Sequence, residues 1–425
     1  MMNKYKKFIE EIYPLHRTII SYDMYKTHDI VKKYLPREIE YKINKFQTGL
    51  EVYDWKIPKL YDVKKAYFIE KSTGKRYANF SDNNLHIVSY SQPINKEINY
   101  EELTNHLYYS NQIDDAIPWK FNYYSEHWGF CITKNDFLQL DKSSRFEVVI
   151  DSKFEDDYLL VGEVIIEGKT KDEIVILCDV CHPYQVDDSI SGVVVALELI
   201  KKLSKQQNNF TYRFLFLPET IGSLTYLSQN ENKIQNIKYA FFSEMLGNSN
   251  QLSLQLSHQS DSKIDKAFSV LKDKYNIRTG DFQKIVKNDE IVFNSPGINI
   301  PSISVSRSKK VMDSFYGYHT SYDNPDNLIY ENIEIAISYI KESLNILDED
   351  FIPIPNFKGL IFYSKTFLWD QYCTKLGKKE EIDAIVFEIN GKNSILDISI
   401  KIDVNYQLCK EFIDDLKRLS YIKYA

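Results

Sequence analysis

The spacing of hydrophobic residues changes along the chain and predicts different elements in its first two parts. Up to about residue 50, apolar residues recur at helical spacing, and Ile9, Ile12 and Ile19 could share one packed face. From about 52 to 150 the chain has short alternating runs, rich in aromatic residues and broken by Gly, Asn and Pro. We therefore expect an N-terminal helical segment followed by a β-rich module.

A third pattern, from about residue 161 to 347, alternates apolar strands with loops and helices. The two clearest helices are expected at 191–205 and 327–347. The expected strands are five short apolar runs, 163–168, 173–180, 212–218, 239–246 and 302–307. This alternation builds an α/β sheet covered by helices, and ligands then lie beyond the carboxyl ends of its strands.

The last part of the chain is predicted to be a small helical unit behind a linker. Two prolines within 351–359 forbid a helix there and end the helix before it. The helix lengths and short turns that follow are typical of a winged helix. The predicted domains are an α/β domain at 1–51 and 151–349, an inserted β-rich domain at 52–150 and a winged-helix-like domain at 356–425.

Composition limits the location and the partners of the protein. The 425 residues are 43% hydrophobic and carry a formal net charge of -7, which permits a large core and disfavours a broad phosphate-binding surface. No apolar run is long enough to span a bilayer, and charges interrupt the N-terminal segment where an export signal needs an apolar stretch. Five scattered cysteines are typical of reduced thiols. We expect a cytoplasmic protein with no membrane partner, and nucleic acid is disfavoured.

The stretch from Cys178 to His182 has the CxxCH spacing of c-type haem attachment. Haem is attached in this way to exported chains, and Pro183 follows His182 at once, so the haem interpretation is disfavoured. A structural zinc site would need a second cysteine or histidine pair, which the sequence lacks. We expect Cys181 to be a small buried residue beside a site of another kind.

Two chemically useful side chains share the loop after the 173–180 strand. His182 and Asp188 lie six residues apart there, so an imidazole and a carboxylate could converge on one cation. The alternative is that Asp187, Asp188 or Ser189 caps the helix that follows, since all are preferred residues at that position. From this loop alone, both interpretations stay open.

The other strand ends carry similar side chains. Glu219 comes directly after an apolar strand, and Glu244 lies inside an apolar run where a lone charge is costly to bury. His319 stands among aromatic residues ahead of an acidic turn. A capping glutamate and a hydrogen-bonded loop histidine are the alternatives, but together with His182 and Asp188 these residues form a ligand set suited to zinc.

Four stretches resemble the motifs of the zinc aminopeptidase family that includes bacterial leucyl aminopeptidases and glutaminyl cyclases. They are CHPYQVDDSISG, LPETIGS, FSEMLGN and YHTSYDNPDNL. More specifically, the chain resembles a bacterial aminopeptidase-like branch with an inserted β-rich domain and a C-terminal winged helix, through VYDWKIP, HWGFCIT and NDEIVFNSPGINIPSISVSR. The resemblance implies a three-layer α/β/α core of zinc-aminopeptidase type carrying both additions.

The resemblance also implies a metal site. It makes His182 a ligand and Asp188 the carboxylate that can bridge two metals, with Glu244 a ligand to one metal and His319 to the other. Asp187 and Ser189 stand where relatives commonly have Asn, which leaves the Asp188 carboxylate unchanged. The implied cofactor is one or two zinc ions.

Glu219 matches the general base of that family, which takes a proton from metal-bound water. The next position is usually a second glutamate that binds metal, and here it is Thr220. This departure leaves open whether a second metal binds, and whether Glu219 acts as base or as ligand.

Two further carboxylates are candidate substrate-binding groups. By resemblance, the loop with Asp289 and Glu290 lines the active site, so these side chains could hold a cationic substrate amine. Solvated loop charges are the alternative. Arg307 and Tyr318 could also touch the substrate.

The sequence thus predicts a zinc-dependent hydrolase of amide bonds, an aminopeptidase that acts on a small peptide or aminoacyl conjugate. A deacylase, amidase or cyclase acting on an aminoacyl or sugar conjugate is the alternative, since the branch is associated with bacterial surface-polysaccharide biosynthesis. A winged-helix DNA-binding regulator with a degenerate peptidase body is a third. Glu411, Asp414 and Asp415 on the candidate recognition helix would face phosphates, which favours packing or homo-oligomer formation instead.

Overall fold

The computed structural model describes residues 2–376 and 379–424 and has two compact units. The first unit comprises Met1–Ser260 and Asn276–Ser338, and the second comprises Asp261–Tyr275 and Tyr339–Ala425. Within the described residues, no helix combines the length and the apolar character that crossing a bilayer requires.

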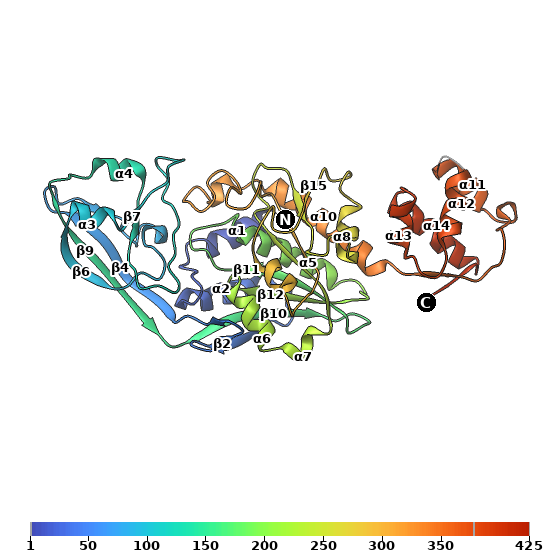
Figure 1. Cartoon of the computed structure of the whole chain (residues 1–425), viewed down its shortest axis with the longest axis horizontal. Helices are drawn as coiled ribbons and strands as arrows, with labels where there is room; N and C mark the ends of the chain where they lie inside the picture. Colours follow the sequence, from blue (N-terminus) through green and yellow to red (C-terminus); the bar gives the residue numbers. More distant parts are fainter. Residues whose placement is uncertain (1, 377–378, 425) are drawn as a thin grey trace. The chain divides into compact units, whose positions relative to one another are not determined.

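An eight-stranded mixed sheet organises the first unit (Figure 1). Its strands, in spatial order, are β1 (Lys42–Gln47), β10 (Tyr158–Ile166), β12 (Thr211–Leu217), β11 (Glu173–Asp179), β13 (Ile237–Glu244), β16 (Ser302–Ser306), β14 (Ser253–Gln255) and β15 (Arg278–Gly280). The four central strands β12, β11, β13 and β16 run parallel. The five predicted strands are thus confirmed. The carboxyl ends of the four parallel strands share one edge of the sheet, whereas β10 runs antiparallel to β12.

Helices cover both faces of this sheet. Every residue of β11 and β12 is buried, although side chains along a strand alternate between the faces, so both faces must be covered. The helices of the unit include α1 (Met2–Ile12), α2 (Tyr22–Tyr34), α5 (Ile190–Leu203), α6 (Ile221–Ser228), α7 (Glu231–Ile234) and α9 (Asp289–Asn294). α5 and α10 (Tyr330–Glu349) confirm the two helices expected from periodicity.

Gly192 lets α5 pack directly on the backbone of β13. A β-carbon at this position would lie 1.9 Å from the carbonyl oxygen of Ser243, the residue before Glu244. We expect Gly192→Ala to lower the free energy of unfolding by about 3 kcal/mol or more, because overpacking against backbone outweighs the roughly 1 kcal/mol that alanine gains in a helix. Urea unfolding followed by circular dichroism measures the change.

The matched control is Gly74→Ala. Nothing lies within 4 Å of a β-carbon there, so only the positive φ of +73° opposes the substitution, at a cost of about 1 kcal/mol. Equal stability of Gly192→Ala and the wild type would show that α5 does not need this close approach.

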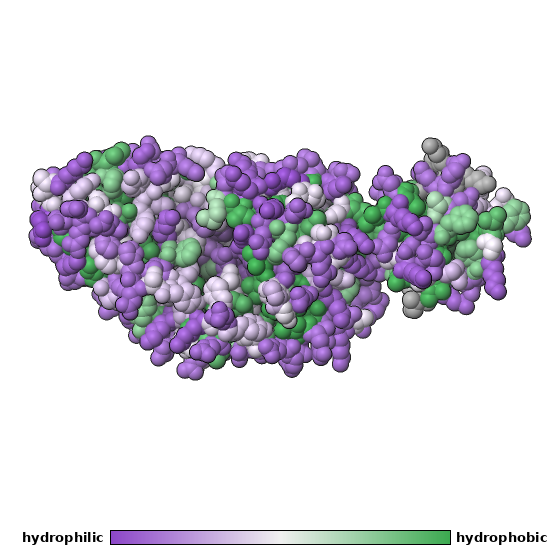
Figure 2. All heavy atoms as spheres, in the orientation of Figure 1, coloured by the Kyte–Doolittle hydropathy of each residue, from purple (hydrophilic) through white to green (hydrophobic). Residues whose placement is uncertain are grey.

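The β-rich part of the first unit is built on a four-stranded antiparallel sheet. Its strands, in spatial order, are β5 (Arg76–Tyr77), β4 (Leu60–Glu70), β9 (Arg145–Glu155) and β6 (Ile94–Asn99). Shorter elements complete it: β2 (Glu51–Val52), β3 (Trp55–Lys56), η1 (Asn84–His86), α3 (Tyr100–Thr104), β7 (Leu107–Tyr108), β8 (Phe130–Cys131) and α4 (Lys134–Gln139). Hydrophilic side chains cover most of the face that Figure 2 shows.

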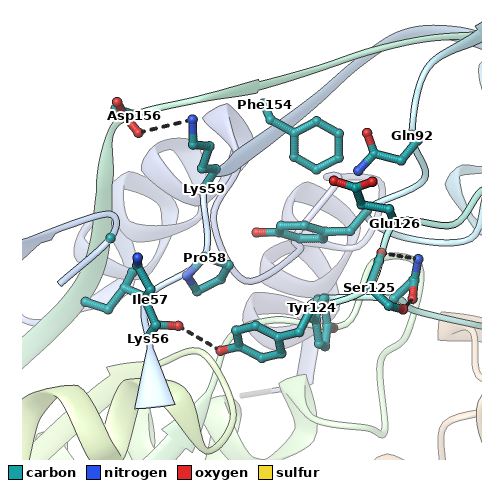
Figure 3. Close-up of a pocket in the computed structure, with 14 residues that line it drawn as sticks. Lys56, Ile57, Pro58, Lys59, Gln92, Tyr124, Ser125, Glu126, Phe154 and Asp156 are labelled. Carbon is teal, nitrogen blue, oxygen red and sulfur yellow. Dashed lines mark hydrogen bonds and ion pairs between the residues drawn. The ribbon is translucent and has the colours of Figure 1, made fainter. Parts of the chain in front are cut away.

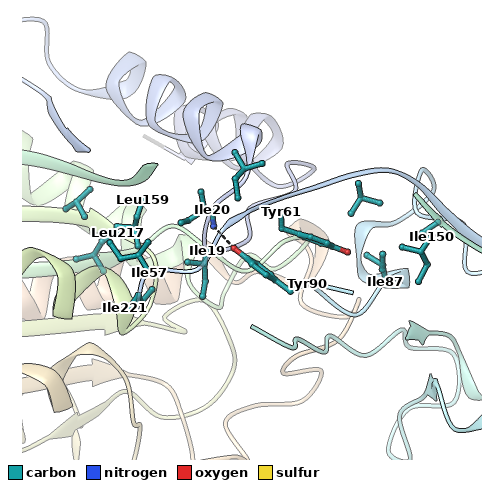
Figure 4. Close-up of a cluster of buried hydrophobic side chains, with 14 of the residues drawn as sticks. Ile19, Ile20, Ile57, Tyr61, Ile87, Tyr90, Ile150, Leu159, Leu217 and Ile221 are labelled. Carbon is teal, nitrogen blue, oxygen red and sulfur yellow. Dashed lines mark hydrogen bonds between the residues drawn. The ribbon is translucent and has the colours of Figure 1, made fainter. Parts of the chain in front are cut away.

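One hydrophobic cluster joins the β-rich part to the α/β part. Tyr61, Tyr90 and Ile150 belong to the same buried cluster as Leu217 and Ile221, which flank the end of β12 (Figure 4). The rings of Tyr61 and Tyr90 stack with centroids 4.9 Å apart. Because this core is continuous, the two parts form one unit. The domain boundaries at residues 51 and 150 stay predictions.

The second unit is mainly helical. Its elements include α8 (Lys263–Ser269), η3 (Tyr363–Lys365), α11 (Leu368–Leu376), α12 (Lys379–Glu388), α13 (Ile395–Lys401), α14 (Tyr406–Arg418) and a two-stranded sheet of β17 (Pro353–Pro355) and β18 (Ile422–Tyr424). The expected linker 351–359 therefore contains an edge strand, a place where proline is tolerated. The winged helix stays a prediction.

Candidate metal and active site

Four of the predicted site residues meet where the loops after three strands come together. His182 and Asp188 lie between β11 and α5, Glu219 lies between β12 and α6, and His319 follows β16. The Nε2 atom of His182 lies 3.0 Å from Oε2 of Glu219. The Nε2 atom of His319 lies 3.0 Å from Oδ2 of Asp188, and the two imidazole rings stack with centroids 5.9 Å apart.

The donor atoms of these residues are spaced closely enough to hold a metal ion. In the group His182, Asp188 and His319, one donor atom from each side chain lies within 4.8 Å of the others. The group Cys181, His182 and Glu219 meets the same criterion. Because zinc binds nitrogen and oxygen at about 2.0–2.2 Å, a small inward movement would bring either group around one ion.

Burial divides the site into an inner and an outer side. His182 and Asp188 are each 2% exposed, whereas the side chains of His319 and Glu219 are 28% and 32% exposed. Burial lowers the pKa of His182, but its interactions with Cys181 and Asp188 outweigh the effect of burial. The pKa of His182 is therefore raised. Burial likewise opposes ionisation of Asp188, yet the two histidines lower its pKa. A ligand can therefore approach the buried pair from the side of Glu219.

Glu244, the last residue of β13, lies behind Asp188. Its Oε1 accepts a hydrogen bond of 2.5 Å from Nδ2 of Asn288, while Oε2 has no hydrogen-bond partner among the described residues. Burial and the charge of Asp188 raise the pKa of Glu244 well above its usual range. The Oε2 atom of Glu244 could therefore serve as a metal ligand beside Asp188.

Acidic side chains are concentrated around this point. Seven with at most 2% exposure lie on the loops and helix starts that form the site: Asp179, Asp187, Asp188, Glu244, Asp289, Glu290 and Asp323. Only part of that charge is offset by the buried Arg17 and Arg307. Because buried carboxylates are costly without compensation, a divalent cation fits these residues.

Four backbone positions at the site are strained. His182, Thr220, Met245 and His319 have φ of 73°, 61°, 53° and 56°, a left-handed region that residues other than glycine rarely adopt. Each lies at the site or directly beside one of its residues. Strained conformations of this kind persist where the surrounding structure holds them for function.

Thr220, which stands in place of the expected second glutamate, is the centre of a γ-turn. Its φ and ψ are 61° and -63°, and the N–H of Ile221 donates to the carbonyl of Glu219 at 2.7 Å. The carboxylate of Asp289 accepts the N–H of Thr220 at 3.1–3.2 Å. Asp289 thus fixes the turn that presents Glu219.

The two predicted substrate-binding residues are fully buried and have internal partners. Asp289 is 0% exposed and holds the Thr220 turn, and burial raises its pKa to about 6. Glu290 is 0% exposed, accepts from Gln255 Nε2 at 3.0 Å and from the N–H of Asn288, and burial raises its pKa to about 7. Their substrate-binding role stays a prediction.

Arg17, far away in sequence, holds the loop that carries His182. Its guanidinium is 0% exposed and donates to the carbonyls of Val180, Cys181 and Gln185 at 3.0, 2.7 and 2.7 Å. Sequence reasoning missed this residue, since 163 positions separate it from the first of these partners.

Trp119 brings the β-rich part of the chain to the site. Its backbone N–H donates to the carbonyl of His319 at 2.7 Å, and its ring meets the rings of His182 and His319 edge to face, with centroids 4.4 and 4.7 Å away. A reciprocal pair of hydrogen bonds between Ile117 and Ser321 holds the two segments together. The β-rich part therefore forms one wall of the site.

The remaining candidates line the site or support it. Cys181 is 2% exposed, as expected, and its sulfur accepts the N–H of Glu219 at 3.3 Å. The Tyr318 ring stacks on His319 with centroids 3.8 Å apart. Arg307 donates to the carbonyls of Leu246 and Asn250, so it supports the loop after β13.

The sheet, and the loops that carry the site, have the fold of the zinc aminopeptidases. BSAP, a zinc aminopeptidase from Bacillus subtilis, superposes with a TM-score of 0.60 at 13% identity, over 80% of this chain and 94% of that one. A peptidase M28 precursor from Shewanella amazonensis gives a TM-score of 0.56 at 11% identity, over 81% and 92%. At these identities the likeness is one of fold, and it confirms the predicted fold class.

The chain belongs to the family described as "Domain of unknown function (DUF4910)", whose model matches residues 6–350. A Clostridium acetobutylicum protein named "Putative polysaccharide biosynthesis protein with aminopeptidase-like domain" is 35% identical, over 98% of this chain and 95% of its own length. The crystal structure of a "putative peptidase" from the same organism superposes with a TM-score of 0.88 at 32% identity, over 100% and 96%. The β-rich and C-terminal parts therefore have counterparts in that structure.

Proposed function

We propose that the protein is a cytoplasmic zinc-dependent hydrolase of amide bonds, an aminopeptidase acting on small peptides or aminoacyl conjugates. The observation that carries the proposal is the meeting of the buried His182 and Asp188 with the partly exposed His319, whose donor atoms lie within 4.8 Å of one another. The names of the relatives, a "putative peptidase" and a protein with an "aminopeptidase-like domain", support it.

In this proposal, His182, Asp188 and His319 hold zinc, and Glu244 lends its free oxygen to the same site. Three protein ligands and an open position are typical of catalytic zinc, so the first three side chains suffice and Glu244 would be a fourth ligand. Zinc bound there supplies a Lewis acid that polarises an amide carbonyl and lowers the pKa of a water molecule. Because Thr220 has no carboxylate, one ion is the simpler arrangement.

Glu219 is proposed as the general base. Its side chain is 32% exposed and lies beside His182, so it faces both the solvent and the inner site. It would take a proton from the attacking water and pass it to the nitrogen of the leaving amine. The Thr220 turn and Asp289 hold Glu219 in position. The turn fixes the carbonyl of Glu219, and the Asp289 carboxylate fixes the N–H of Thr220, which follows it.

The described residues of the C-terminal unit do not favour DNA binding. On α14, Lys410 pairs with Asp414 at 2.7 Å and Arg418 pairs with Asp415 at 2.8 Å, and Lys375 reaches Glu411 at 3.4 Å. Basic groups already paired with carboxylates are poorly placed to bind phosphates. Packing or homo-oligomer formation stays the proposed role of this unit.

An activity screen of the zinc-loaded protein tests the proposal. The substrates are aminoacyl amides, acylated amino sugars and peptides with N-terminal glutamine, each assayed before and after removal of zinc by a chelator. We expect hydrolysis of at least one class that is lost with the chelator and restored by zinc. The proposal would be contradicted if the chelator left turnover unchanged. It would also be contradicted if protein shown to contain zinc hydrolysed no substrate class.

A further inference from the structure

A cavity of about 540 Å³ lies in the β-rich part of the first unit and is lined by none of the predicted site residues (Figure 3). It is bounded by the segment after β3, by the loop 122–126 and by residues at the end of β9. Its volume falls within the range of about 300–1,000 Å³ that small-molecule sites occupy. No part of the proposed hydrolytic chemistry uses it.

A series of aromatic rings connects this cavity to the histidines. Trp119, which packs against His182 and His319, meets Phe121 with centroids 4.9 Å apart, and Phe121 stacks on Tyr123 at 4.7 Å. Tyr123 lines the cavity. Three successive ring contacts of 4.4, 4.9 and 4.7 Å thus lead from His182 to the cavity, so a substrate that reaches both must be an extended conjugate.

The cavity offers aromatic faces and amide groups. Tyr124 is 57% exposed, and Trp55, 43% exposed, meets its ring edge to face at 6.1 Å. The hydroxyl of Tyr124 donates to the carbonyl of Lys56 at 3.0 Å, which fixes the ring. In Figure 3, Gln92 lies near Phe154, so an amide stands beside an apolar ring. Flat apolar faces next to hydrogen-bonding amides suit a molecule with C–H groups on its faces and hydroxyls on its rim.

The charges around the cavity balance. Two lysines, Lys56 and Lys59, line it together with Glu126 and Asp156, and the ammonium of Lys59 lies 3.8 Å from the Asp156 carboxylate. A phosphate site would instead present an excess of cations. The balance favours a neutral ligand.

We propose that this cavity binds a neutral pyranose ring, the sugar part of an aminoacyl or acyl amino sugar whose amide bond lies at Glu219. The position of the amide rests on the proposed function, whereas binding of the sugar does not. The protein is then a hydrolase of sugar conjugates, and the β-rich part selects the substrate.

Titration of the full-length, zinc-free protein with methyl N-acetylglucosaminide, followed by saturation-transfer NMR, tests the proposal. We expect binding by the wild type and about fivefold weaker binding by Tyr124→Ala, since one aromatic contact contributes roughly 1 kcal/mol. Tyr124→Phe keeps the ring and should retain most of the affinity. Phe362→Ala, at an aromatic position in the second unit with nearly the same exposure (59%), is the matched control and should bind like the wild type.

Several outcomes would overturn the proposal. They are no binding by the wild type, equal binding by the wild type and Tyr124→Ala, or tighter binding of a sugar phosphate than of the neutral sugar. The variant His319→Ala tests sugar binding independently of the proposed hydrolase function. If it hydrolyses no substrate but still binds the sugar, the result supports the sugar-binding proposal. If the wild-type enzyme is active but binds no sugar, the sugar-binding proposal is wrong and the proposed hydrolase function stands.

Discussion

Replacing Glu219 by glutamine is expected to lower kcat by roughly 100- to 10,000-fold while zinc stays bound. The amide has nearly the shape of the carboxylate, but it cannot accept the proton of the attacking water. Because the side chain is 32% exposed, the variant should fold as the wild type does. Steady-state hydrolysis, measured together with zinc content by atomic emission, checks both halves of the prediction.

The same experiment decides between base and ligand for Glu219. Loss of zinc together with activity would make Glu219 a ligand, as its place in the group with Cys181 and His182 permits. Glu231→Gln, an exposed glutamate at the start of α7, is the matched control and should change neither quantity. Full activity of Glu219→Gln would contradict the proposed mechanism outright.

Arg17→Met is expected to lower the free energy of unfolding by about 3 kcal/mol or more. The guanidinium satisfies three buried carbonyls of the loop that bears His182, and each carbonyl left without a donor costs about 1–3 kcal/mol. Its positive charge also lies near Asp188 and Asp323, so its loss leaves those carboxylates with less compensation. Urea unfolding of zinc-free protein isolates this effect from metal binding.

Two further variants sharpen the result for Arg17. Arg17→Lys keeps the positive charge, but lysine lacks the planar fork that donates to three carbonyls. Its free energy of unfolding should therefore lie between those of the wild type and Arg17→Met. Arg37→Met, at an exposed position, should leave stability within about 0.5 kcal/mol of the wild type. An Arg17→Met protein as stable as the wild type would show that water replaces the guanidinium without cost.

The features that the sequence predicted best depend on neighbours in the chain. Apolar runs long enough to be buried strands identified β11, β12 and β13, and polar residues directly after them identified His182 and Glu219. Because carboxyl ends of parallel strands share an edge, local pattern alone brought these side chains together. The same pattern placed His319 in the candidate zinc ligand set, with a hydrogen-bonded loop histidine as the alternative, and the resemblance to zinc aminopeptidases then implied its role as a metal ligand.

The features that the sequence did not predict depend on contacts between distant segments. Arg17 and Trp119 support the site from positions far from its motifs, and nothing in their surroundings marks them. Asp289 was expected to meet solvent or substrate, but the Thr220 turn takes its carboxylate. The strands β14 and β15 have three residues each, which is too few for the alternation of apolar and polar residues to be recognised in the sequence.

Zinc content is the most direct test of the central claim, that His182 and His319 hold one metal site. Wild-type protein, loaded with zinc and dialysed, should retain about one ion per chain, and His182→Ala and His319→Ala should each retain far less. His258→Ala, at an exposed histidine, should match the wild type. If both His182→Ala and His319→Ala keep the zinc content of the wild type, these imidazoles are not its ligands and the account is wrong.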